Sequence, residues 1–242
     1  MSEPRSTSPN DVKGVPAELI PALLRKIEAE ATSAESRSAY DSALLRSAQI
    51  DLAKKEDVWS RELASDYYHR VYYFDGQVDS KSVGFCIDQL DTWDRTQPES
   101  NIEIVFTSPG GSVIDGLALF DHIQYLKRKG HTITTVCLGV AASMAGILLQ
   151  SGTTRIMTKE SWLLIHQISA GVMGSFGEIE DRVDWINRTQ ERVIDIFASR
   201  ASAVTGEDYN KTRRYIKKNW ERTDWWIDSD EALKLGFIDE VR

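Results

Sequence analysis

Residues 102–150 read IEIVFTSPGGSVIDGLALFDHIQYLKRKGHTITTVCLGVAASMAGILLQ, and this stretch decides the fold. The apolar run over residues 102–106 predicts a buried strand, and apolar residues recur at the helical period over residues 113–129. Residues 133–138 predict a second strand, and residues 141–150 are apolar enough for a buried helix. Strands that alternate with helices in this way predict an α/β core.

The alternation continues on both sides of this stretch. Further strands are predicted over residues 71–74, 155–157 and 162–165, and a helix over residues 80–93. A long amphipathic helix is predicted over residues 177–203. Its apolar stripe consists of Ile179, Val183, Ile186, Val193, Ile194 and Phe197.

The N-terminal part differs in composition from the rest. Residues 1–15 mix Ser, Pro, Asn and Gly, which predicts a flexible tail. Residues 16–69 predict a helical N-terminal extension, because residues 22–75 contain neither Gly nor Pro. Thr32 and Glu35 have the spacing of a capping box, so two helices or one long kinked helix fit equally well. We expect this extension to act as a packing or oligomer-facing arm.

Composition excludes several classes of protein. The 242 residues include 29 Lys and Arg against 37 Asp and Glu, a net charge of −8, which argues against nucleic-acid binding. No uninterrupted apolar run approaches the ~20 residues that span a bilayer, and no signal peptide is recognisable, so we expect a cytoplasmic protein without a membrane partner. Cys86 and Cys137 belong to no metal-binding motif and are predicted to be small buried residues. No metal or cofactor is expected.

Elimination among the four histidines leaves one candidate for chemistry. His122 and His131 have charged neighbours and are predicted to be solvated, and His69 is predicted to lie at the surface or to pack. His166 instead follows the apolar run of residues 162–165, and the carboxyl end of a buried strand is where α/β folds bind ligands. Taken alone, a hydrogen-bonded core histidine is the simpler interpretation of His166.

Ser143 stands among small residues in GVAASMAG, residues 139–146. A serine at a helix start, with small neighbours, allows a substrate to approach the backbone closely. A serine that caps a buried helix is the simpler interpretation of the motif alone. The motif is not the G-x-S-x-G elbow, so it gives no support to an α/β-hydrolase fold.

The run Ser108-Pro109-Gly110-Gly111-Ser112 follows a predicted strand and opens a predicted helix. Two consecutive glycines allow conformations and close approaches that side chains forbid. The N–H groups of such a turn can bind an anion or an oxyanion. The run lacks the spacing and the lysine of a nucleotide-binding P-loop.

In combination, these three segments resemble the caseinolytic protease proteolytic subunit family, ClpP. The resemblance extends over residues 70–242 and includes residues 71–78 (VYYFDGQV), the glycine-bearing residues 171–180, and residues 231–239 (EALKLGFID). It implies an α/β fold of the ClpP/crotonase type, built of repeated β-β-α units, with a protruding handle at about residues 167–203. It also implies a serine endopeptidase that needs no cofactor and cleaves polypeptides.

The resemblance implies a role for each matching residue. Ser143 matches the nucleophile and His166 the general base, while Asp224 matches the orienting acid, with Asp228 and Asp230 as nearby alternatives. The residues implied to form the oxyanion hole, through their backbone N–H groups, are Gly111 and Met144. The residues implied to bind substrate are Gly110, Gly111, Ser112, Val113 and Gln167.

Partners follow from the same resemblance. The family forms homo-oligomers of heptameric rings, alone or stacked as a tetradecamer, and works with an AAA+ unfoldase. This chain has Thr107 where the family commonly has Asn, and Ile168 where it commonly has Pro. Its N-terminal extension replaces the short axial loop through which typical members dock their ATPase. The alternatives are a phage-type head (capsid) maturation protease of the same superfamily, a crotonase-type acyl-CoA enzyme, and a non-catalytic scaffold.

Overall fold

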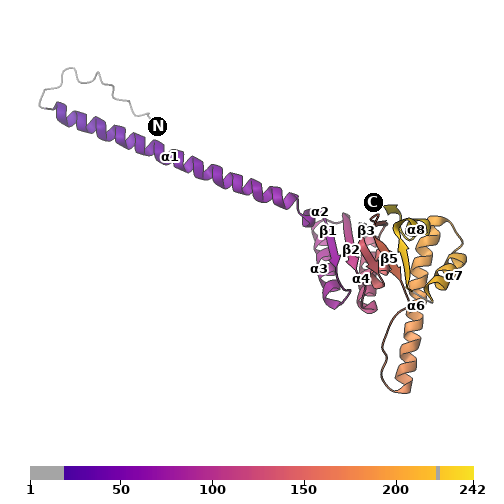
Figure 1. Cartoon of the computed structure of the whole chain (residues 1–242). Helices are drawn as coiled ribbons and strands as arrows, with labels where there is room; N and C mark the ends of the chain where they lie inside the picture. The colour runs from indigo at the N-terminus through magenta and orange to yellow at the C-terminus, as the bar shows by residue number, and fades with distance from the viewer. Residues whose placement is uncertain (1–18, 222–223) are drawn as a thin grey trace. The chain divides into compact units, whose positions relative to one another are not determined.

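The computed structural model describes residues 19–221 and 224–242 (Figure 1). The flexible tail predicted for residues 1–15 lies outside the described residues. The chain divides into two compact units, Met1–Leu63 and Ala64–Arg242. Among the described helices, none is both long and apolar enough to cross a membrane.

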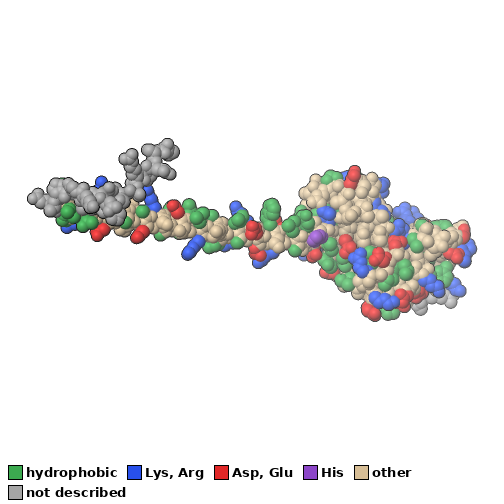
Figure 2. Space-filling view, turned by 90° about the horizontal axis from the view of Figure 1, so that it is seen from above, with side chains coloured by type: hydrophobic (Ala, Val, Ile, Leu, Met, Phe, Trp, Pro, Cys, Tyr) green, Lys and Arg blue, Asp and Glu red, His purple; other side chains and the backbone are tan. Residues whose placement is uncertain are grey.

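The described part of the first unit is a single helix, α1, which spans Ile20–Leu63. Neither a second helix nor a capping box begins at Thr32, since the Thr32 hydroxyl donates a hydrogen bond of 2.8 Å to the Glu28 carbonyl one turn earlier. The helix continues because its Ala, Glu, Lys, Arg and Leu residues all favour propagation. No residue of α1 is buried, and Figure 2 shows hydrophobic, basic and acidic side chains interspersed along its surface.

The second unit contains a seven-stranded sheet. Its strands are β1 (Val71–Asp75), β2 (Asn101–Ser108), β3 (Thr132–Ala142), β4 (Thr154–Met157), β5 (Trp162–Ile165), β6 (Trp225–Asp228) and β7 (Glu240–Val241). The order β1-β2-β3-β4-β7 is parallel throughout. β5 pairs with β3 in parallel, and β6 pairs with β5 in antiparallel orientation.

Helices complete the second unit. They are α2 (Asp66–His69), α3 (Ser80–Thr96), α4 (Val113–Arg128), α5 (Met144–Leu149), α6 (Phe176–Thr205), α7 (Tyr209–Trp220) and α8 (Ser229–Lys234). Apolar side chains from α3 to α7 pack with those of β1, β2 and β3 in one continuous core. The predicted α/β class, with a helical N-terminal region, is confirmed.

Strand β3 changes partner along its length. Residues 134–137 pair with β4, whereas residues 140–142 pair with β5. Between them Gly139 takes φ +74°, and the pairing with β2 shifts between Phe106 and Ser108. A glycine suits this irregularity because it adopts positive φ without strain. The bend brings the carboxyl end of β3 beside β5.

This bend also corrects one prediction. Ala141 and Ala142 were predicted to open the buried helix, but both belong to β3, and α5 begins at Met144. An apolar run is compatible with a buried strand or a buried helix, and the pairing with β5 decides the matter here.

Helix α6 is buried only in its second half. Its buried residues are Thr189, Val193, Ile194, Phe197, Ala198 and Ala201. From Phe176 to Arg188 no residue is buried, and Figure 1 shows this half extending beyond the sheet. The helix predicted over residues 177–203 is confirmed, with an unpacked first half.

The polar interior includes a histidine whose predicted exposure is wrong. His131 is 3% exposed, with Nε2 2.9 Å from Asp94 Oδ1. Lys129 also pairs with Asp94, but its side chain is exposed, so a charged neighbour in sequence does not prevent the histidine ring from being buried. Both cysteines are buried, as predicted. Burial raises the pKa of the Cys137 thiol to about 11.

Candidate active site

The turn between β3 and α5 presents Ser143 in a strained conformation. Its φ of 54° and ψ of −121° lie in a region that non-glycine residues rarely occupy. The Ser143 N–H donates a hydrogen bond of 2.8 Å to the Leu164 carbonyl in β5, which holds the turn. The Ser143 side chain makes no capping hydrogen bond to α5, so the alternative of a helix-capping serine is wrong.

The Gly110-Gly111 turn packs closely against this serine. Val78 is hydrogen-bonded to the turn: its N–H donates to the Gly110 carbonyl at 2.9 Å, and its carbonyl accepts from the Ser112 N–H at 2.7 Å. Gly110 has φ +89°, and a Cβ placed on it would lie 2.7 Å from the Ser143 Cβ. A Cβ on Gly111, at φ +152°, would lie 2.2 Å from the Val78 oxygen. Only glycine fits at either position.

Two backbone donors near the serine are unused. The N–H groups of Gly111 and Met144 donate no hydrogen bond to any other described residue. Met144 is the first residue of α5, where helical N–H groups have no intrahelical acceptor. Both residues line the same cavity as Ser143, so both donors can serve an oxyanion that forms there.

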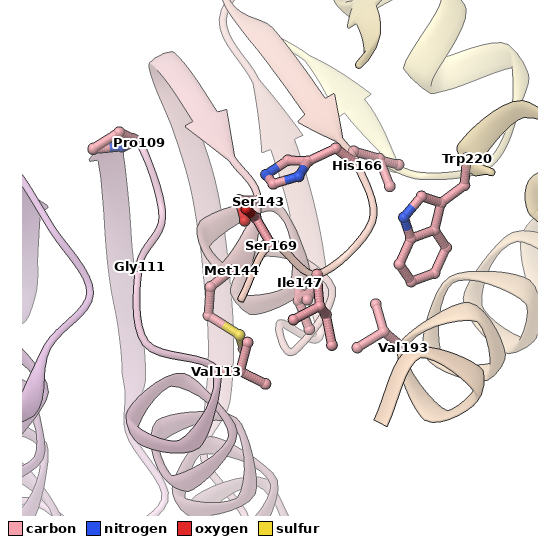
Figure 3. Close-up of a pocket in the computed structure, with 12 residues that line it drawn as sticks. Pro109, Gly111, Val113, Ser143, Met144, Ile147, His166, Ser169, Val193 and Trp220 are labelled. Carbon is pink, nitrogen blue, oxygen red and sulfur yellow. The ribbon is translucent and has the colours of Figure 1, made fainter. Parts of the chain in front are cut away.

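This cavity has a volume of about 230 Å³ and brings together elements that are distant in sequence (Figure 3). Ser143 and His166 line it, and Figure 3 shows the imidazole directed toward the serine. The remaining lining residues are Pro109, Gly111, Val113, Met144, Ile147, Ile165, Ile168, Ser169, Val193 and Trp220. The wall is therefore mixed: aliphatic side chains and Met144 form part of it, and Ser143, His166, Ser169 and the Trp220 indole add polar groups.

The pairing of β5 with β6 positions Asp224. Ile165 and Trp225 are the last residues paired in this antiparallel ladder, so His166 and Asp224 are the next residue along on each side. His166 and Asp224 also line a second, open cavity of about 340 Å³, together with Gln167.

Among the described residues, no hydrogen bond joins Ser143 to His166 or His166 to Asp224. Catalytic hydrogen bonds are commonly long in unliganded sites and shorten when substrate binds. The neighbouring carboxylates are engaged elsewhere. Asp228 accepts a hydrogen bond from the Glu231 N–H at 2.8 Å and caps α8, and Asp230 pairs with Lys159.

The other residues implied to bind substrate do not all line the same cavity. Ser112 caps α4 by accepting a hydrogen bond from the Asp115 N–H, while Val113 lines the first cavity and Gln167 the second. Thr107, which departs from the family pattern, donates to the Leu138 carbonyl at the bend of β3.

Sequence reasoning missed the far wall of the first cavity. Ile147, Val193 and Trp220 reach it from α5, α6 and α7. Helix α7 was not predicted, although Ile216 and Trp220 stand four residues apart on its buried face and Asp208 caps its start. That spacing and cap were the signal available in the sequence.

An α/β fold that gathers a strained serine, a histidine and unused backbone N–H groups around one cavity defines the class of serine hydrolases. Residues 54–242 match the family model Clp protease. Over 187 residues the chain is 35% identical to the ATP-dependent Clp protease proteolytic subunit 1 of Prochlorococcus marinus (strain MIT 9312). The alignment covers 76% of this chain and 88% of that protein.

The chain belongs to the Clp protease family and is a serine peptidase of the ClpP type. The resemblance inferred from residues 70–242 is confirmed. The family match begins at residue 54, so most of α1 lies outside it.

Proposed function

We propose that this protein is a cytoplasmic serine endopeptidase in which Ser143, His166 and Asp224 form the catalytic triad. Two shared cavities carry the proposal: His166 lines one with Ser143 and the other with Asp224, which adjoins the last paired residue of β6 as His166 adjoins that of β5. Asp224 is also the carboxylate of this segment that neither caps a helix nor pairs with a lysine, in contrast to Asp228 and Asp230.

The chemistry follows from these positions. His166 accepts the Ser143 proton as the serine oxygen bonds to the scissile carbonyl carbon, and the Asp224 carboxylate orients the resulting imidazolium. The N–H groups of Gly111 and Met144 donate to the oxyanion. His166 then protonates the leaving amine as the C–N bond breaks. Water repeats the sequence and releases the acyl group as a carboxylic acid.

The substrate is an extended polypeptide. Residues 110–113 offer a main chain against which a substrate strand can add, and Gln167 lines the second cavity, which shares His166 with the first. The cavity beside Ser143 receives the side chain that precedes the scissile bond.

The working form in this proposal is a homo-oligomer of heptameric rings, stacked as a tetradecamer. The first half of α6 supports it, because Ile179, Val183 and Ile186 stand on a segment without buried residues. In this arrangement residues 70–242 form the peptidase domain, residues 167–203 the handle between rings, and residues 16–69 an extension. In this proposal an AAA+ unfoldase supplies unfolded chains; the name of the Prochlorococcus relative describes that protease as ATP-dependent.

The direct test is cleavage of an unfolded polypeptide by Ser143→Ala. We expect a loss of about 10⁵-fold or more in kcat, since removing a triad serine leaves only binding and the oxyanion hole. Ser199→Ala, an exposed serine of α6, is the matched control and retains activity. Cleavage by Ser143→Ala at the wild-type rate would exclude the mechanism, as expected for a scaffold or for an acyl-CoA enzyme that needs no nucleophilic serine.

A further inference from the structure

The indole of Trp220 carries a donor that the fold leaves unused. Trp220 ends α7, is 3% exposed, and lines the cavity that contains Ser143. Its Nε1 atom is buried and has no hydrogen-bond partner among the described residues. Figure 3 shows the nitrogen-bearing edge of the ring turned toward the cavity.

An unused buried donor is unusual in a folded protein. Nearly all buried polar groups find a partner, because losing the bond to water without replacement is unfavourable. Trp93, which is equally buried, follows this rule by donating from Nε1 to the Tyr67 carbonyl at 3.1 Å. The described residues therefore supply Trp220 with no acceptor, and the cavity it faces is where an acceptor can enter.

The rest of the wall defines the chemistry of that acceptor. The apolar part of the wall comes from Val113, Met144, Ile147, Ile165, Ile168 and Val193, and the other polar side chains that line it are Ser143, His166 and Ser169. A side chain that enters must have an apolar stem, and a charged end would lose its hydration without gaining an opposite charge. An uncharged acceptor on an unbranched stem, as in methionine or glutamine, satisfies both the wall and the indole N–H.

We propose that Trp220 is a specificity-determining residue. Its N–H selects substrates whose residue on the acyl side of the scissile bond (P1) carries an uncharged hydrogen-bond acceptor. This inference rests on the proposed function, because it places the P1 side chain in the cavity beside Ser143.

An isosteric series of substrates tests the idea on the full-length protein. Three peptides differ only at P1, which is norleucine, methionine or O-methylhomoserine, so that one atom changes from CH₂ to sulfur to oxygen. Acceptor strength rises along the series while shape stays nearly constant. The wild type should cleave the ether peptide with a kcat/KM about 3- to 10-fold above that for norleucine, the range of one net hydrogen bond.

Trp220→Phe removes the N–H and keeps an aromatic ring. In this variant the ratio of kcat/KM between ether and norleucine peptides should fall by the same factor. Trp93→Phe, which removes a donor outside the cavity, should leave the ratio at the wild-type value. An unchanged ratio in Trp220→Phe would overturn the specificity role of Trp220 and would leave the proposed triad unaffected.

Two further outcomes are decisive. If Trp220→Phe does not fold, the wild-type series decides, and a wild type that prefers norleucine overturns the proposal. If the wild type cleaves none of the three peptides but cleaves a peptide with another P1 residue, the proposed role of Trp220 is wrong and the proposed triad is unaffected. Absence of any peptide cleavage by the assembled wild type overturns both proposals.

Discussion

The backbone N–H of Ser143 donates a hydrogen bond of 2.8 Å to the carbonyl oxygen of Leu164. This bond ties the serine turn to β5, the strand that ends one residue before His166. Leu164 also pairs with Trp226 in β6, two residues after Asp224. One short strand, β5, therefore contacts the segments that carry all three side chains of the proposed triad. These segments are distant in sequence and come together through strand pairing.

Gly110→Ala should impair catalysis through the backbone. The added Cβ would lie 2.5 Å from the Ala142 oxygen and 2.9 Å from the Met144 nitrogen, so the turn must move away from Ser143. We expect peptide cleavage to fall by about 100-fold or more, because displacement of an oxyanion donor has a cost of that order. Gly171→Ala is the control, since nothing lies within 4 Å of its added Cβ. Full activity of Gly110→Ala would argue against the proposed oxyanion hole.

Asp224→Asn and Asp228→Asn separate the candidate acids. Asp224→Asn should lower kcat by about 10⁴-fold, because an amide cannot stabilise the imidazolium and favours the wrong imidazole tautomer. Asp228→Asn should keep its activity, since Asn caps a helix as well as Asp does and the Glu231 N–H retains its acceptor. Kinetics on one peptide measure both effects. The reverse pattern would assign the role to Asp228.

Asp239→Asn should destabilise the second unit. The Arg155 side chain is fully buried, and its Nη2 and Nε lie 2.6 and 3.0 Å from the two Asp239 carboxylate oxygens. Removing the carboxylate charge leaves a buried guanidinium uncompensated, at a cost of about 3 kcal/mol in the free energy of unfolding. Denaturant titration at neutral pH measures it, and an unchanged midpoint would show that the ion pair is not needed.

The same pair predicts a pH dependence. Burial acts to raise the pKa of Asp239, but the hydrogen bonds and charge of Arg155 outweigh it, and the pKa lies below its ordinary value of 3.8. A carboxyl whose pKa is lower in the folded state stabilises that state above its unfolded pKa and loses this contribution as pH falls through the folded pKa. Wild type should therefore lose more stability than Asp239→Asn below about pH 4. Parallel curves for the two proteins would contradict this account.

Much of the fold is predictable because local pattern and tertiary packing agree. The run at residues 162–165 is a strand by pattern and is β5 in the structure, and the period of residues 113–129 matches α4 almost to its ends. The pattern fails where packing decides between two compatible states. Ala141 and Ala142 suit a buried helix or a buried strand, and the pairing with β5 makes them strand.

The candidate site is predictable only in part. Ser143 and His166 stand at motif positions, so the resemblance identifies them. Trp220 forms part of the same cavity through the packing of α7 against α6, which no short motif encodes. His131 was misassigned for a similar reason, since its partner Asp94 lies far away in sequence and only the fold brings them together.

The most direct test of the central claim is reaction of the assembled protein with a fluorophosphonate, followed by intact-mass analysis and peptide mapping. Such a reagent phosphonylates a serine only when a neighbouring base has activated it. We predict one adduct per chain, located on Ser143, in parallel with loss of peptide cleavage, and no adduct on Ser143→Ala. An adduct on another residue, or an active protein whose Ser143 stays unmodified, would contradict the claim that Ser143 is the nucleophile.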